Sequence, residues 1–168
     1  MAQLEDAVRF GGMVLAHAAW IASVLEDGAL VCPFAIIRTG CDREVVAFES
    51  DSQAESIERG KASFQDYKER VDFWSFAREG LLSYVGSDEP KVDVLTISAW
   101  GQGLDEPVIL RQRFNPKVKG GFKLVGPIEV AIHGMIPPEP TSSALRLIAL
   151  QRVEQHPHGE LWATWTNP

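Results

Sequence analysis

Hydrophobic positions recur every three or four residues along the first 25 residues of the chain, which predicts a helix over residues 4–26. The positions of that stripe are Leu4, Val8, Gly11, Leu15, Ala18, Ala22 and Leu25. Other apolar residues, among them Met13, Trp20 and Val24, lie off the stripe. A helix that is apolar nearly all round needs cover on more than one side. We expect the helix to stop at Gly28, because glycine readily adopts the left-handed conformation that ends helices.

Two β-strands are predicted next, over residues 29–38 and 43–49, with turn residues at 39–42 between them. The first strand is apolar on both of its faces. Ser52, followed three residues later by Glu55, is typical of a capping box, so a second helix is expected to begin there.

The segment 73–84 could prolong this second helix or form a strand. Turn signals recur at 86–90, 101–106 and 115–121, and the segments between them, 92–100 and 108–114, are strand-like. Regular spacing of this kind is typical of an antiparallel meander. We therefore predict that 73–84 is its first strand and 122–133 its last, with a break near Gly126.

The sequence of the C-terminal region is compatible with two structures, a helix or a hairpin. Three hydroxyl residues at 141–143 precede a segment rich in Ala, Leu, Arg and Gln, which favours a short helix over 144–154. The alternative is a hairpin in which 144–154 pairs with 160–166. The whole chain, 1–168, is thus expected to form a single α+β domain of order α-β-β-α-β-β-β-β plus a C-terminal element. An antiparallel sheet of five to six strands would be covered by two main helices on one face.

Composition and charge narrow the functional classes. Hydrophobic residues make up 45% of the chain and charged residues 23%, as in an ordinary globular protein. The net charge of −7 repels polyanions, so we expect no nucleic-acid partner. The apolar run 10–25 is shorter than the roughly 20 residues that cross a bilayer, and its acidic upstream flank is unlike a signal peptide. We expect a soluble, cytoplasmic protein with no membrane contact and with free cysteines at Cys32 and Cys41.

Catalytic and metal-binding patterns are weak. The sequence holds no Gly-x-Ser-x-Gly, His-Glu-x-x-His or Cys-x-x-Cys motif. His156 and His158, with His133 and Glu160 as possible additions, are the nearest approach to a metal site. A closed site usually needs three or four ligands with a supporting shell, so we expect exposed histidines, no metal and no cofactor. His17 is expected to be a core residue with a hydrogen-bond partner.

One basic segment is a candidate anion-binding site. Five cations occur within thirteen residues that contain no acid, namely Arg111, Arg113, Lys117, Lys119 and Lys123. The glycines at 120–121 could expose backbone amides to an anion. The alternative is a solvated hairpin whose lysines discourage pairing at the sheet edge.

Aromatic and apolar residues suggest an interface. Tryptophan is enriched at binding hot spots, and the candidates here are Met13, Trp20, Val24, Trp162 and Trp165. The alternative is that the C-terminal tail buries them within the monomer. Our leading hypothesis is a non-enzymatic binding or assembly protein that forms a homodimer. The alternative hypothesis is a small-molecule-binding protein or enzyme, of unknown ligand, with an anion-contacting pocket between the sheet and the first helix.

Overall fold

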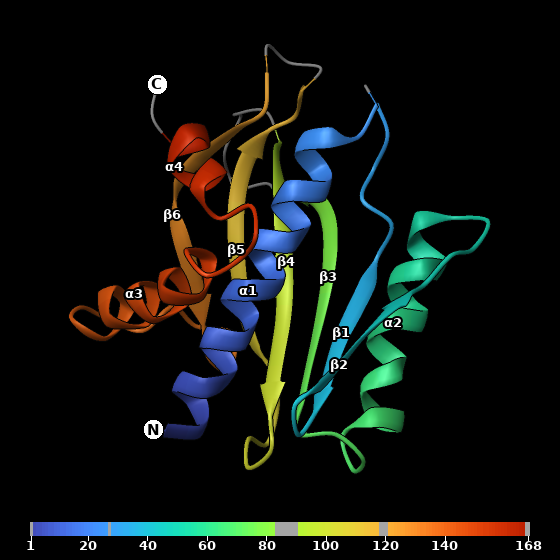
Figure 1. The fold of residues 1–168 in the computed structure, drawn as a ribbon, viewed down its shortest axis with the longest axis vertical. Helices are drawn as coiled ribbons and strands as arrows, with labels where there is room; N and C mark the ends of the chain where they lie inside the picture. The colour runs from blue at the N-terminus through green and yellow to red at the C-terminus, as the bar shows by residue number, and fades with distance from the viewer. Residues whose placement is uncertain (1, 27, 83–90, 118–120, 167–168) are drawn as a thin grey trace.

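A computed structural model describes residues 2–26, 28–82, 91–117 and 121–166, and Figure 1 shows their arrangement. Its elements are α1 (Ala2–Val24), β1 (Phe34–Thr39), β2 (Asp42–Ala47), α2 (Gln53–Tyr67), β3 (Phe73–Leu82), β4 (Val92–Gly101), β5 (Val108–Asn115), β6 (Lys123–Ala131), α3 (Thr141–Val153) and α4 (Glu160–Thr166). The predicted α+β order is confirmed, and the C-terminal element is a pair of helices. The hairpin alternative for 144–166 is wrong.

The six strands form one antiparallel sheet of order β2-β1-β3-β4-β5-β6. The predicted meander is confirmed, since residues 73–82 are a strand that pairs along its whole length with β4. The predicted break in the last strand is also present. The β5–β6 register shifts between Arg111 and Arg113, and Gly126 adopts a φ of +71°, a conformation that glycine tolerates.

The larger core lies between α1 and one face of the sheet. Side chains alternate along each strand, so Phe34 and Ile36 of β1 face α1 together with Leu95 and Ile97 of β4. Gly11 allows α1 to approach the sheet closely, because a Cβ at that position would stand 2.9 Å from the Cβ of Ala99.

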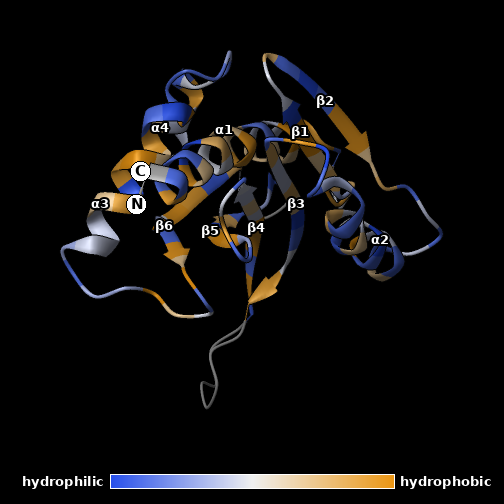
Figure 2. Ribbon diagram, turned by 90° about the horizontal axis from the view of Figure 1, so that it is seen from below, coloured by the Kyte–Doolittle hydropathy of each residue, from blue (hydrophilic) through white to orange (hydrophobic). Residues whose placement is uncertain are grey.

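The second helix covers the opposite face of the sheet, so the prediction that the helices share one face is wrong. Ala35 and Ile37 of β1 belong to a separate core cluster with Trp74 and Phe76 of β3. Figure 2 shows α1 and α2 on opposite sides of the sheet. The physical reason is that β1 and β3 are apolar on both faces, and each face needs its own cover.

The C-terminal helices cover a second side of α1. Helix α3 packs across α1, and both α3 and α4 contact β6. Trp162 of α4 is buried in the larger core, and the ring of Trp165 lies 5.0 Å from that of Phe122. The additional apolar surface of α1 is therefore largely covered within the chain.

Within the described residues, one helix is long and apolar enough to cross a membrane, by length and composition only. This helix spans Gln3–Val24, and 61% of its most apolar 18-residue stretch is buried inside the fold. Burial of this kind is also what a core helix requires, and α1 contributes many residues to the larger core cluster.

Candidate anion-binding pocket

A cavity of about 630 Å³ lies between the first turns of α1, the β1–β2 hairpin, the start of β3 and the end of α3. Its size falls within the roughly 300–1,000 Å³ of small-molecule sites. We call it the arginine pocket. Its lining residues are Asp6, Arg9, Phe10, Met13, Arg38, Gly40, Cys41, Arg43, Phe73 and Arg152.

The local sequence explains how these residues meet. Residues three and four apart share one face of a helix, which brings Asp6, Phe10 and Met13 to the same side of α1. On the hairpin, Arg38 and Arg43 are direct cross-strand partners, and directly opposed residues of an antiparallel pair project to one face. The two arginines therefore extend the α1 face of the sheet beyond its apolar part.

Arg38 is the central residue of the pocket. Its guanidinium carbon lies 4.3 Å from the ring centre of Phe73 and 5.9 Å from that of Phe10. The Nε atom of Arg38 is buried and has no protein acceptor. Among the described residues, no carboxylate lies within ion-pair distance of Arg38. A buried donor without an acceptor costs about 1–3 kcal/mol, and an anion beside this guanidinium would reduce that cost.

The helical arginines of the pocket are held in place by neighbouring side chains. Arg9 donates to Asp6 at 3.0 Å and to the side chain of Gln151 on α3 at 3.2 Å. Arg152 donates to Gln155 at 2.7 Å. The lining thus contains four arginines and one aspartate, a formal charge of +3. Two carboxylates contact the lining from outside, Glu5 at Arg9 and Asp72 at the Gly40 amide, and they reduce the local formal charge to +1, in a chain whose net charge is −7. A concave site lined mainly by one sign of charge concentrates ligands of the opposite sign.

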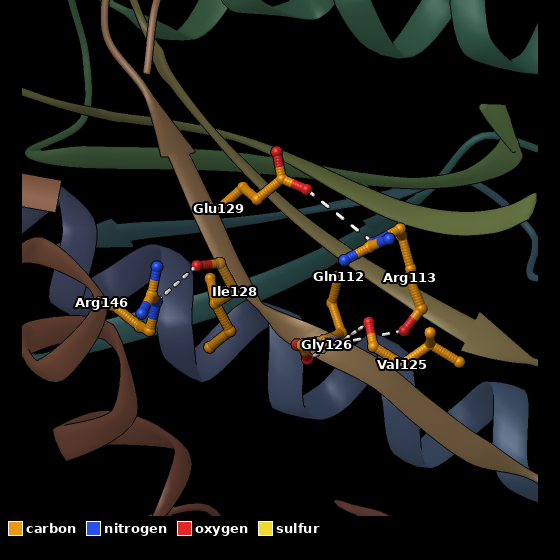
Figure 3. Close-up of polar contacts among 7 residues, drawn as sticks. All are labelled: Gln112, Arg113, Val125, Gly126, Ile128, Glu129 and Arg146. Atoms are coloured by element: carbon orange, nitrogen blue, oxygen red, sulfur yellow. Dashed lines mark hydrogen bonds and ion pairs between the residues drawn. The ribbon is translucent and has the colours of Figure 1, made fainter. Parts of the chain in front are cut away.

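The predicted basic segment lies elsewhere. Arg111 and Arg113 face away from α1, because the alternate residues Leu110 and Phe114 belong to the larger core on the α1 side. Arg113 Nε lies 3.9 Å from Glu129 Oε1, and Figure 3 shows the two side chains directed toward each other, with Gln112 bonded to carbonyls of β6.

The lysines of that segment also lie outside the arginine pocket. Lys123 is exposed, and its strand partner is Asn115. Lys117 is exposed beside a smaller cavity at the other end of α1, and Lys119 lies outside the described residues. The residues on the outer sheet face include Arg78, whose pKa is lowered by burial and by the nearby charge of Arg111, with Glu58 opposing. The structure therefore brings Arg111 together with Arg78 and not with the arginine pocket.

The predicted interface residues have different environments. Met13 lines the arginine pocket and packs against the larger core. Trp20 stacks on His158 with ring centres 4.4 Å apart and an interplanar angle of 3°. Trp162 is buried and Trp165 packs on Phe122, whereas Val24 is 59% exposed. Of the five, only Val24 is a freely exposed apolar side chain.

Three histidines from distant positions meet beside α1. His17 Nδ1 lies 3.2 Å from His156 Nε2, so His17 has the partner that was predicted for it. His156 is 8% exposed, which differs from the exposed histidine expected from the sequence. His156 Nδ1 accepts a hydrogen bond from the backbone N–H of His158. A histidine that binds a metal usually donates from its second nitrogen, so this arrangement favours a hydrogen-bonded pair. Within the described part of the chain, no three His, Cys, Asp or Glu side chains are placed to share a metal ion.

Sequence reasoning missed the arginines of the pocket, because it searched for cations that are close along the chain. Arg9, Arg38, Arg43 and Arg152 come from three separate regions and meet only after folding. Two signals could have indicated part of the site. Arg38 ends an otherwise apolar strand, and Arg43 follows the turn at the position that pairs with it.

Comparisons of the chain with protein-family models, curated proteins and solved structures find no match. The residues of the arginine pocket are therefore the basis for a proposed function.

Proposed function

We propose that this protein is a non-enzymatic binding protein for a small organic anion that carries a carboxylate or phosphate group. The observation that supports the proposal most directly is Arg38, a cation held against Phe73 with no carboxylate partner, in a cavity that three further arginines line. A guanidinium held against an aromatic ring presents its N–H groups in a fixed geometry, which suits carboxylates and phosphates. Phe10, Met13 and Phe73 would contact the apolar part of the ligand.

The position of this pocket agrees with the alternative hypothesis from the sequence, a pocket between the sheet and the first helix. Its residues differ from those expected, since the arginines of the pocket replace the basic segment 111–123. The homodimer stays a prediction with less support. A homodimer was expected because the first helix carries more apolar surface than one sheet face can cover. In the structure, α3 and α4 cover most of that surface.

We expect Arg38→Met to weaken the binding of sulfate, the simplest probe anion, by about 10- to 100-fold. This range corresponds to the loss of a hydrogen bond to a charged group, about 1.5–3 kcal/mol. Methionine keeps the contact with Phe73, so the fold should persist. Isothermal titration calorimetry with sodium sulfate measures the change in Kd.

The matched control is Arg111→Met, which removes an arginine of the opposite sheet face. It should leave sulfate affinity unchanged. If Arg111→Met lost sulfate binding and Arg38→Met retained it, the site would be the outer sheet face and the arginine pocket would be rejected.

Cys41 provides an independent reporter, because it is exposed and lines the arginine pocket. In a Cys32→Ser variant, saturating sulfate should slow the reaction of Cys41 with iodoacetamide, a neutral thiol reagent, in proportion to occupancy. In the reciprocal Cys41→Ser variant, Cys32 should react at the same rate with and without sulfate. Equal protection of both thiols would indicate a general salt effect and would count against occupation of the pocket.

A further inference from the structure

The hydrogen bonds around His17 and His156 define which ring nitrogens carry protons. A backbone N–H can only donate, so the bond from the His158 amide to His156 Nδ1, at 3.1 Å, leaves that nitrogen without a proton. The proton of neutral His156 is then on Nε2, which donates to His17 Nδ1 across 3.2 Å. His17 in turn carries its proton on Nε2. Both rings are neutral, and both hydrogen bonds are satisfied, in one arrangement of tautomers.

This histidine pair lies one helical turn beyond the arginine pocket along α1. His17 follows the lining residue Met13 by four residues, which is one turn along the same face of α1. His156 lies three residues beyond the end of α3 at Val153, and its Nε2 contacts His17. The pair therefore joins α1 to the segment after α3, beside the wall that the two helices contribute.

The surroundings of the pair favour its neutral state. The pKa of His17 is lowered by burial and by the charge of His158. The pKa of His156 is lowered by burial first and then by His17, His158 and Arg43, while Glu160 of α4 acts in the opposite direction. Arg43 belongs to the hairpin wall of the arginine pocket. An anion bound there would offset the positive charge of Arg43, which is one of the charges that lower the pKa of His156.

We propose that anion binding in the arginine pocket is coupled to the uptake of one proton by the histidine pair, at Nδ1 of His156. The proposal rests on the proposed function and adds its regulation by pH. Nδ1 of His156 is the position that can be protonated while Nε2 continues to donate to His17. The added proton breaks the bond from the His158 amide, and the remaining bond to His17 becomes charge-assisted and stronger. An anion beside Arg43 offsets the repulsion that otherwise opposes this charge.

The coupling is reciprocal, so protonation must strengthen anion binding as much as the anion strengthens protonation. Anion affinity should therefore rise as the pH falls from 8 through the range in which the histidines titrate. A shift of one pKa unit corresponds to about a tenfold change in affinity. Sulfate is the appropriate probe, because it keeps the same charge throughout this pH range.

Calorimetric titrations with sulfate between pH 8 and pH 5.5, in two buffers with different ionisation enthalpies, give both Kd and the number of protons taken up. For the wild-type protein we expect an affinity several-fold higher at the acidic end, with proton uptake on sulfate binding below pH 6.5. His156→Gln should bind sulfate at pH 8 as the wild type does, with no gain on acidification. His133→Gln is the matched control, since His133 is exposed, contacts Glu106 between β4 and β5, and does not line the arginine pocket. His133→Gln should keep the increase in sulfate affinity on acidification.

The outcomes separate the two proposals. Absence of sulfate binding by the wild type at every pH would reject the proposed function itself. Sulfate binding with the same affinity at every pH, or with an unchanged gain in His156→Gln, would overturn only the coupling. If His156→Gln does not fold, nitrogen-15 spectra of the wild-type imidazoles decide. At pH 5.5, sulfate should increase the protonated fraction of His156 Nδ1, and an unchanged fraction would reject the coupling.

Discussion

Gly12→Ala should destabilise the protein by about 3 kcal/mol, although alanine is the better helix former by about 1 kcal/mol. A Cβ on Gly12 would stand 2.2 Å from the carbonyl oxygen of Ala149 and 2.9 Å from its carbonyl carbon. These are backbone atoms of α3, so no side-chain rotation can relieve the overlap. The two helices must separate, and the buried contacts between them weaken.

For a protein of this size, about 3 kcal/mol corresponds to a fall in Tm of about 6–12 °C, which differential scanning calorimetry measures. Two glycines serve as controls. Gly11→Ala meets side chains at 2.9 Å and beyond, so its effect should be smaller. Gly80→Ala meets nothing within 4 Å and should change Tm little. An unchanged or higher Tm for Gly12→Ala would show that α1 and α3 do not approach each other as closely as described.

Glu79→Gln should change the free energy of unfolding more favourably at pH 8.5 than at pH 4.5, and we expect the difference between the two effects to be about 3 kcal/mol. Glu79 is 7% exposed on the α1 face of β3. Its pKa is raised to about 7, chiefly by burial and then by the charge of Asp93, while a hydrogen bond from the backbone of Val31 opposes the rise. The folded state therefore binds the proton more tightly than the unfolded state does.

The sign follows from that difference. The stabilising contribution of protonated Glu79 is complete below the unfolded pKa of 4.5 and is lost as the pH rises through about 7. Glutamine resembles the protonated carboxyl and never ionises, so it avoids the loss. Urea unfolding of both proteins at the two pH values gives the difference in free energy of unfolding. The exposed residue Glu69 provides the control, since Glu69→Gln should not change with pH in this way. A Glu79→Gln effect that is equal at both pH values would contradict the assignment.

The histidine pair affects stability in the opposite direction, which is why the Glu79 prediction compares two proteins at each pH and not a single pH curve. The pKa values of His17 and His156 are lowered in the folded state, so their contribution is complete above the unfolded value of 6.5 and decreases as the pH falls. Below neutrality the two contributions therefore oppose each other, because a rising pH removes the contribution of protonated Glu79 and restores that of the neutral histidines.

Several elements were predictable because their signals are local. The capping residue Ser52 accepts a hydrogen bond from the amide of Glu55 at 3.1 Å, as the sequence predicted. Gly40 has a positive φ at the hairpin turn, as the sequence predicted. Gly28 also has a positive φ, but α1 ends at Val24, so Gly28 belongs to the following turn and the predicted helix stop at Gly28 is wrong. The hairpin register also separates Cys32 from Cys41, and both are free, as expected. Regularly spaced turn signals were sufficient to predict the meander, because turn residues act over only a few positions of the chain.

Other features could not be derived from local patterns. The two apolar faces of β1 were visible in the sequence, but only the structure decided that α2 covers the face opposite α1. The hydroxyl residues at 141–143 indicated the start of α3, yet the amide of Ser143 is bound by the side chain of Glu139. Glu79 occupies a strand position whose burial depends on α1, so its raised pKa has no signature in the chain.

The sequence by itself determined the elements of this protein, the antiparallel sheet and the excess of apolar surface on the first helix. Only the tertiary structure decided which surface the C-terminal helices cover, and which polar groups meet. The arginine pocket joins residues from Arg9 to Arg152, and the histidine pair joins His17 to His156. The physical reason is the distance over which each kind of interaction acts. Backbone preferences and hydrophobic periodicity act over a few residues, whereas the field and the hydrogen bonds of a site depend on distances in space that exist only when the chain is folded.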